Sequence, residues 1–172
     1  MGRTEDQDFT AFVAERGASL LRIAYALTGD RHAAEDLVQS ALAKAYARWS
    51  RIHGDAEPYV RRVLYHEQVS RWRWSGRRPE VMYASVPDRP VTGPDEHTAL
   101  RMMLRDALRQ LPPRQRAVLV LRYLEDLSVE QTAQILGCRT GTVASQASRA
   151  LERLRKLVPD FAELTDQSEA LR

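Results

Sequence analysis

The clearest chemical signal in this 172-residue chain lies near its C-terminal end, in residues 140–157. Apolar residues recur there at the three- and four-residue spacing of one helix face: Val143, Ala147, Ala150, Leu151, Leu154 and Leu157. The opposite face carries small hydroxyls, an amide and cations: Thr142, Ser145, Gln146, Ser148, Arg149, Arg153 and Lys156. A solvated face would mix acids with these cations, but Glu152 is the single acid of the segment. We therefore expect this face to meet a negatively charged partner.

A second segment, residues 58–74, interleaves cations with aromatic rings. Because arginine holds phosphates and an aromatic ring stacks on an unpaired base, this combination is typical of proteins that bind single-stranded DNA. The set comprises Arg61, Arg62, Arg71 and Arg73 with Tyr59, Tyr65, Trp72 and Trp74. The aromatic residues have an alternative place in a hydrophobic core, and Tyr65 falls near the inward stripe of Val69. Trp74 has the alternative role of covering the end of its domain.

The positive charge of the chain is unevenly distributed. The net charge is +3, but residues 98–158 hold 11 basic and 5 acidic residues, whereas the tail 159–172 holds 1 basic and 4 acidic residues. This concentration of charge around the 140–157 segment is an electrostatic footprint for nucleic acid. Hydrophobic residues make up 44% of the chain, which argues against disorder of the whole chain.

The composition gives little support for an enzyme, a metal site or a membrane protein. Cys138 is the only cysteine, so no internal disulfide forms, and a buried thiol in a reducing cytosol is expected. The chain has no phosphate-binding glycine loop and no Ser/His/Asp set, and His32, Glu35 and Asp36 lack a second cluster of metal ligands. No apolar run approaches the length of a membrane span, and the N-terminus does not resemble a signal peptide. We expect no cofactor, no enzymatic activity and a cytoplasmic location.

Helical periodicity dominates the sequence, so the predicted fold is all-α, with two small helical domains joined by a flexible linker. The first domain, 1–74, is expected to be a bundle of three helices, over 8–27, 31–49 and 58–74, with Asp30 capping the second. The linker, 75–97, holds four of the eight prolines and no helical period. The second domain spans 98–158, and the acidic tail 159–172 follows it.

The second domain contains the strongest local signals. Helices are expected from Thr98 to just before Leu111 and from Pro113 to about Glu125, with Leu124 on the inward side of the latter. Ser128 and Gln131 form a capping box that opens a further helix, and Gly137 is placed for a left-handed C-cap.

A last helix would follow this glycine turn, with Thr140 as its expected cap. A short helix, a tight turn and a second helix with a polar outer face describe a helix-turn-helix, whose second helix enters the DNA major groove. The alternative is a helical hairpin with a merely solvated face.

Two stretches of sequence resemble bacterial RNA polymerase sigma factors, best the extracytoplasmic function (ECF) group and particularly its actinobacterial SigE-like branch. The stretch "LPPRQRAVLVLRYLEDLSVEQTAQILGC" followed by "GTVASQASRALERLR" resembles sigma region 4. "AEDLVQSALAKAYARW", 34–49, resembles region 2.2, and "PYVRRVLYHEQVSRWRW", 58–74, resembles regions 2.3 and 2.4. The resemblance spans residues from about 9 to 158, with both blocks in the expected order. It implies a factor that binds core RNA polymerase, recognises −35 and −10 promoter elements and promotes melting.

The resemblance also implies which residues dock on the polymerase. The region that contacts the clamp helices of the β′ subunit corresponds to Asp36, Leu37, Gln39 and Ser40, and the β flap is the other expected contact on core. Leu37 is chemically better suited to the core of the bundle. Family members usually carry an acid at the position of Ser40, so one docking contact is missing from this helix. The alternative interpretation is a solvated helix start, with acids near the positive end of the helix dipole.

Promoter contacts follow from the same resemblance. The residues placed for the −10 element are His53, Arg61, Arg62, His66, Arg71, Trp72 and Arg73. In related proteins the loop before their helix, here roughly 52–57, holds a flipped base, which favours the open promoter. The residues placed for the −35 element are Arg139, Thr140, Thr142, Ser145, Gln146, Ser148, Arg149 and Arg153.

Two departures from the family pattern concern promoter choice. His66 stands where relatives often have Asn, and Ala144 stands where relatives often have Lys or Arg. Both departures are expected to alter the promoter sequences that the protein prefers.

Two rival functions remain open at this stage. One is a free-standing regulator of duplex DNA, which would not need the 58–74 segment. The other is an inactive sigma-like decoy that titrates an anti-sigma factor. An anti-sigma factor is itself an expected partner of a functional sigma factor. The acidic tail 159–172 could fold back on the basic domain as a brake, or be an untied terminus.

Overall fold

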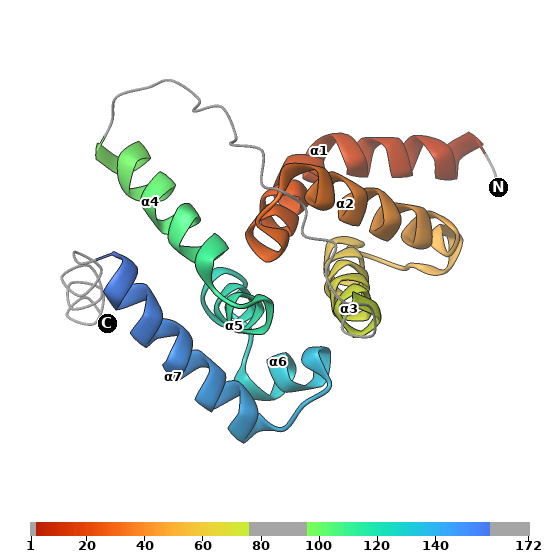
Figure 1. Ribbon diagram of the computed structural model, residues 1–172. Coiled ribbons are helices and arrows are strands. Elements are labelled where there is room, and N and C mark those ends of the chain that lie inside the picture. Colours follow the sequence, from red (N-terminus) through yellow and green to blue (C-terminus); the bar gives the residue numbers. More distant parts are fainter. Residues whose placement is uncertain (1–2, 76–95, 159–172) are drawn as a thin grey trace. The chain divides into compact units, whose positions relative to one another are not determined.

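The computed structural model describes residues 3–75 and 96–158, which are drawn in colour in Figure 1. The chain divides into two compact units, Met1–Asp88 and Arg89–Arg172. Every regular element in the described ranges is a helix or a helical turn, which confirms the all-α prediction. Most of the predicted linker 75–97 and the whole predicted tail 159–172 lie outside the described residues.

The first unit is a bundle of three helices, as the sequence predicted. It contains α1 (Arg3–Thr28), α2 (Arg31–Tyr46), a single 3₁₀ turn η1 (Trp49–Arg51) and α3 (Glu57–Ser75). Each of the three α-helices packs against the other two. The residues buried between them are Leu20, Ala24, Leu27, Ala34, Leu37, Ala41, Val60 and Leu64. Three of these are alanines, which lets the helices approach closely around the larger leucines.

Local chemistry sets the junction between α1 and α2. Gly29 takes a φ of +71°, a left-handed conformation that glycine adopts without a steric penalty. Asp30 is extended, and its Oδ1 accepts a hydrogen bond of 2.8 Å from the backbone N–H of Ala33. The prediction that Asp30 caps α2 is therefore confirmed.

A cluster of aromatic rings joins the N-terminal half of α1 to the end of α2. The ring of Phe9 lies 4.9 Å from that of Tyr46 and 5.0 Å from that of Trp49, and Phe12 lies 5.3 Å from Trp49. Tyr46 also donates a hydrogen bond of 2.7 Å to the carboxylate of Asp6. The cluster anchors η1, so the loop that follows η1 leaves the bundle from a fixed point.

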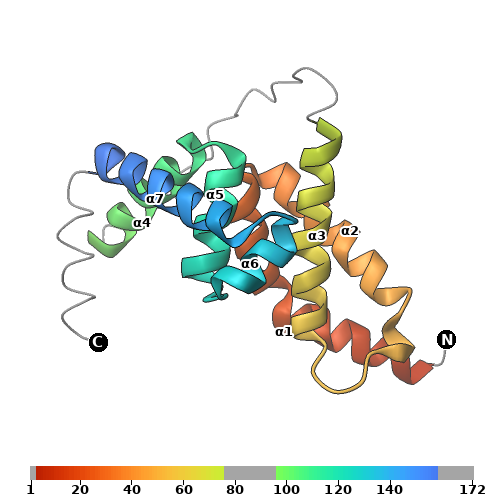
Figure 2. The same ribbon diagram turned by 90° about the horizontal axis from the view of Figure 1, so that it is seen from below.

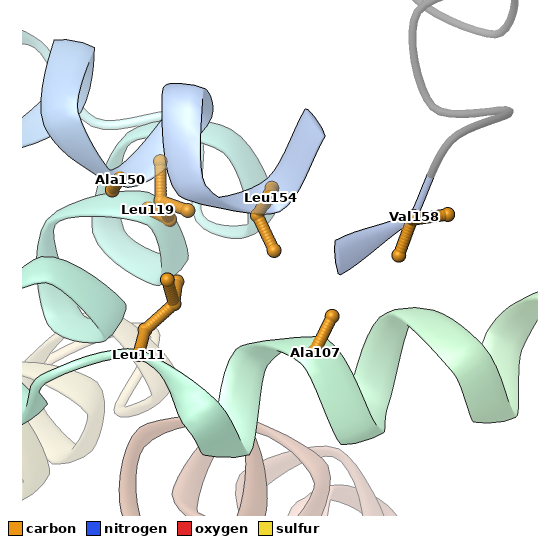
Figure 3. Close-up of a cluster of buried hydrophobic side chains, with 6 residues drawn as sticks. All are labelled: Ala107, Leu111, Leu119, Ala150, Leu154 and Val158. Carbon is orange, nitrogen blue, oxygen red and sulfur yellow. The ribbon is translucent and has the colours of Figure 1, made fainter. Parts of the chain in front are cut away.

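The second unit holds the predicted helix-turn-helix. It contains α4 (Glu96–Gln110), α5 (Pro113–Leu119), a π-helical turn η2 (Val120–Leu124), α6 (Val129–Leu136) and α7 (Thr140–Leu157). Figure 3 shows the larger core cluster, in which side chains from α4, α5, α7 and the residues that directly follow α4 and α7 converge: Ala107, Leu111, Leu119, Ala150, Leu154 and Val158. A second cluster joins α5, α6 and α7 through Val118, Ala133 and Val143. Figure 2 shows α5, α6 and α7 from a second direction.

The predicted helix over 113–125 is present, but its second half, Val120–Leu124, is π-helical and not α-helical. The backbone N–H of Glu125 donates to the carbonyl of Val120 at 2.9 Å, five residues back, so the last turn is a π turn. This wider turn changes the angular position of each following side chain. Leu124, which the α-helical period placed inside, is consequently 58% exposed.

The start and end of α7 also differ from expectation. Arg139, not Thr140, is the N-cap, and it provides no side-chain capping bond. Its extended backbone lets its carbonyl accept from the N–H groups of Thr142 and Val143, at 2.9 and 3.2 Å. Leu157 ends the helix and is exposed, and the next residue, Val158, fills the core position instead.

Candidate nucleic-acid and partner interfaces

An open pocket of about 620 Å³ lies at the loop between α2 and α3. Its lining combines residues of η1, the loop and the first turns of α3: Arg48, Arg51, Ile52, His53, Asp55, Pro58, Tyr59 and Arg62. Gly54 has a φ of +79°, and Asp55 Oδ1 accepts a hydrogen bond of 3.0 Å from the N–H of Glu57, which starts α3. The pocket is therefore built on an anchored loop, and its volume is in the range of small-molecule sites.

The charge of this pocket is positive. Arg48, Arg51 and Arg62 all line it, and none of their side chains has a hydrogen bond or ion pair to another described residue. Asp55 is the only acid in the lining. An aromatic ring, Tyr59, stands half-buried among these cations. Cations beside an aromatic ring suit an unpaired nucleotide, whose phosphate and base need those two groups.

Part of this pocket coincides with the residues that the sequence predicted for the −10 element. His53 and Arg62 were among the predicted −10 residues, and both line the pocket. Arg48 and Arg51 were not predicted. The available signal was that these two arginines, three residues apart, flank Trp49, which the aromatic cluster anchors.

The arginines of α3 fall into two groups. Arg61 donates from Nε (3.0 Å) and Nη2 (2.6 Å) to the carboxylate of Glu57, which also pairs with Arg16 at 3.2 Å. Arg71 donates from Nη2 to the backbone carbonyl of Asp36 at 3.1 Å. These two arginines therefore contact the protein itself.

Arg62 and Arg73 form the other group. Both are exposed, and neither side chain has a hydrogen bond or ion pair to another described residue. They are thus open to an anionic partner.

The remaining predicted residues of α3 vary in exposure. His66 is exposed, and Trp72 is half-buried. Tyr65 is buried beside Val69, which confirms its place in the inward stripe. The side chain of Trp74 lies outside the described set.

The predicted docking residues of α2 divide between its surface and its core. Asp36 and Gln39 are exposed, Ser40 is half-buried, and Leu37 is fully buried, as its chemistry led us to expect. Ser40 Oγ donates a hydrogen bond of 2.8 Å to Oε2 of Glu67 on α3, and Lys44 pairs with Oε1 of the same carboxylate. Burial acts to raise the pKa of Glu67, but the bonds from Lys44 and Ser40 and the charges of Lys44 and Arg71 lower it below its usual value.

The first helix of the helix-turn-helix has the two caps that the sequence predicted. Ser128 Oγ accepts from the N–H of Gln131 at 3.1 Å, and Gln131 Oε1 accepts from the N–H of Ser128 at 2.8 Å. Gly137 closes α6 with φ +64° and ψ +41°. Cys138 is half-buried in the turn.

The outer face of α7 is the one that the spacing predicted. The exposed members of the predicted −35 set are Arg139, Thr140, Thr142, Ser145, Ser148, Arg149 and Arg153, and Gln146 is half-buried. Val143 and Ala150 on the opposite side are buried. Glu152 is neutralised by Lys156, with Nζ 3.0 Å from Oε1, and its pKa is also lowered by the charge of Arg153, whereas the Arg149 side chain has no partner among the described residues. The face therefore presents hydroxyls and uncompensated cations, which suits a DNA groove.

The described residues contain neither a metal-binding cluster nor a membrane-spanning helix. No group of three or more His, Cys, Asp or Glu side chains in these residues could hold a metal ion. No helix in the described part of the chain has the length and apolar character needed to cross a membrane.

Comparison with known proteins identifies both units. Residues 12–78 match the family model described as "Sigma-70 region 2", and residues 101–154 match "Sigma-70, region 4". The RNA polymerase sigma-E factor of Streptomyces coelicolor is 41% identical over 151 residues, covering 87% of this chain and 85% of that protein. The ECF RNA polymerase sigma factor SigE of Mycolicibacterium smegmatis is 30% identical, covering 91% of this chain and 63% of that protein.

A solved structure is similar as well. The sigma factor RpoE of Bartonella quintana, crystallised with the anti-sigma factor NepR, has a TM-score of 0.65 and 28% identity, covering 89% of this chain and 98% of that one. The order of the two matched regions agrees with the resemblance seen in the sequence. The chain therefore belongs to the RNA polymerase sigma factors, and within them to the extracytoplasmic function group.

Proposed function

We propose that this ECF sigma factor initiates transcription through three surfaces: the exposed face of α2, the pocket beside α3, and the outer face of α7. The α2 face binds core RNA polymerase, the pocket and α3 bind the −10 strand, and α7 reads the −35 duplex. The observation that carries this assignment is the pocket, because its arginines have no partner among the described residues. A duplex-only regulator has no use for such a site.

At the −35 element the hydroxyl, amide and guanidinium groups of α7 face the major groove. Ala144 and Gly141 are exposed on the same helix, and such small residues allow close approach to the base edges. Arg149 and Arg153 reach guanine edges or phosphates. Ser145 donates a hydrogen bond of 3.0 Å to the carbonyl of Thr142, so its hydroxyl oxygen remains available as an acceptor.

At the −10 element an unpaired base enters the pocket and its flanking phosphates meet Arg48, Arg51 and Arg62. Holding an unpaired base stabilises the melted promoter relative to the duplex, so opening proceeds by population shift. His53 and Arg73 extend this surface along the strand. Arg71 supports it by bonding α3 to the Asp36 carbonyl of α2, and Arg61 supports it within α3 by bonding to Glu57, which also pairs with Arg16 of α1.

The exposed face of α2 is the surface that binds the polymerase. Asp36 and Gln39 offer acceptors to a basic helix of the polymerase β′ subunit, and Leu37 holds α2 in the bundle. By analogy with RpoE, which was crystallised with NepR, an anti-sigma factor restrains this protein when it is not needed. The protein acts in the cytoplasm, where promoter DNA lies, and catalyses no covalent chemistry of its own.

Run-off transcription with purified core polymerase on a library of genomic promoters tests the function. We expect new starts that share one −35 and one −10 motif, and fewer of them with the double variant Arg48→Ala/Arg51→Ala. Arg22→Ala, which removes an exposed cation of α1, serves as the control. Core binding without any starts would favour the decoy, and absence of core binding would favour the duplex regulator.

A further inference from the structure

Ser40 of α2 is hydrogen-bonded to a carboxylate from another helix. Ser40 Oγ donates to Glu67 Oε2 at 2.8 Å, across 27 positions of sequence. The same carboxylate pairs through Oε1 with Lys44. The Glu67 side chain is only 15% exposed, whereas that of Lys44 is 60% exposed.

The position of this carboxylate on α2 follows from helix geometry. Asp36, Ser40 and Lys44 are spaced by four residues, so they form one row along the helix. The Glu67 carboxylate meets this row at its second and third members. A negative charge therefore lies one turn from Asp36, although α2 itself has no acid there.

The network keeps this carboxylate charged and in place. Arg71, on the same helix as Glu67, donates to the carbonyl of Asp36 at 3.1 Å and so ties α3 to the first member of the row. Lys44, Ser40 and Arg71 together lower the pKa of Glu67 against the opposing effect of burial. The group is consequently ionised at neutral pH.

We propose that Glu67 is a polymerase-docking residue, which supplies from α3 the carboxylate that α2 lacks at Ser40. A cation of the polymerase replaces Lys44 on this carboxylate. The exchange is favourable because an ion pair to an exposed, flexible lysine contributes little, whereas an arginine can bind a carboxylate through two parallel hydrogen bonds. This inference rests on the proposed role of the α2 face.

The experiment moves the carboxylate from one helix to the other. Affinity of the full-length protein for core polymerase is measured for wild type, Glu67→Gln and the double variant Glu67→Gln/Ser40→Asp. We expect Glu67→Gln to weaken binding roughly tenfold, the effect of one charge-assisted contact. The double variant should return to within about threefold of wild type, because it restores the carboxylate on α2. Glu15→Gln, an exposed position of α1, controls for the change in net charge.

A second measurement separates docking from a purely structural role. At saturating core polymerase the Glu67→Gln holoenzyme should open a promoter as the wild type does. Unchanged core affinity in Glu67→Gln would overturn the proposal. So would a defect in promoter opening at saturating core that Ser40→Asp does not repair, since that result assigns Glu67 to holding α3 in place. The role of the α2 face itself is tested by Asp36→Asn, whose unchanged affinity would refute that role independently of Glu67.

Discussion

Mutation of two neighbouring arginines of α3, Arg61 and Arg62, is predicted to affect two different properties of the protein. Arg61 is bonded to Glu57 and its side chain is 29% exposed. Arg62 lines the pocket and has no partner among the described residues. Arg62→Ala should therefore weaken binding of the −10 strand, whereas Arg61→Ala should mainly weaken the fold of the first unit.

The loss of DNA affinity expected for Arg62→Ala follows from the loss of one phosphate contact. A charge-assisted hydrogen bond contributes about 1.5–3 kcal/mol, so affinity at 50 mM salt should fall at least roughly tenfold. Each phosphate contact to a single strand also adds about 0.7 to the slope of log affinity against log salt. The ratio of wild-type to variant affinity should then decrease roughly threefold between 50 and 200 mM salt.

The loss of stability expected for Arg61→Ala depends on how Glu57 is paired once Arg61 is removed. Glu57 would keep only its contact with Arg16, at 3.2 Å. Losing the hydrogen-bonded one of the two cations paired with this partly buried carboxylate should cost about 1 kcal/mol of unfolding free energy. For a unit of this size the melting temperature should fall by about 4–8 °C.

Fluorescence titration of the holoenzyme with a fork-junction promoter DNA gives the salt slopes, and circular dichroism gives the melting temperatures. Wild type and both alanine variants are compared at several salt concentrations between 50 and 200 mM. A salt slope reduced equally by Arg61→Ala and Arg62→Ala, with both proteins equally stable, would refute the distinction between bonded and free arginines.

Three further predictions address the second unit and the charge network. Gly137→Ala should lower the unfolding free energy of the helix-turn-helix by about 1 kcal/mol in denaturant titration, because position 137 has a φ of +64°. Arg149→Ala should weaken −35 duplex binding by about 1–3 kcal/mol if it contacts a base, and selection from randomised −35 duplexes would then show relaxed preference at one position. The lowered pKa of Glu67 means that its ionised form adds stability above the usual carboxyl pKa and that this contribution is lost as the pH falls through the lowered value. On acidification the melting temperature of Glu67→Gln should therefore fall less than that of the wild type. Identical dependence of the two melting temperatures on pH would contradict this.

Features of the fold that depend on neighbouring residues were predictable from the sequence. The capping box of Ser128 and Gln131 and the left-handed Gly137 each satisfy backbone groups within a few positions, so their residue types reveal them. The π turn at Val120–Leu124 has no comparable signature. The wider π turn rotates the following side chains, so Leu124 lies at the surface. Helical periodicity could not show this, because it assumes that every turn has the same width.

Features of the site that depend on contacts between helices were not predictable. Residue type alone made Arg61, Arg62, Arg71 and Arg73 equivalent candidates for DNA binding. The Glu57–Arg61 pair is an i,i+4 contact that spacing could have indicated, but the bond from Arg71 to Asp36 spans 35 positions and requires the packed bundle.

The same reasoning explains why Ser40 looked like a lost contact. A helix face read from sequence includes only its own side chains, whereas the surface that a partner meets also includes groups from the helix packed beside it. Glu67 belongs to α3 by sequence, yet its carboxylate is bonded to two residues of α2. Charge on the α2 surface is therefore determined by both helices, and the two changes Glu67→Gln and Ser40→Asp should be strongly non-additive in core affinity. Independent, additive effects of the two substitutions would show that the polymerase reads each helix separately.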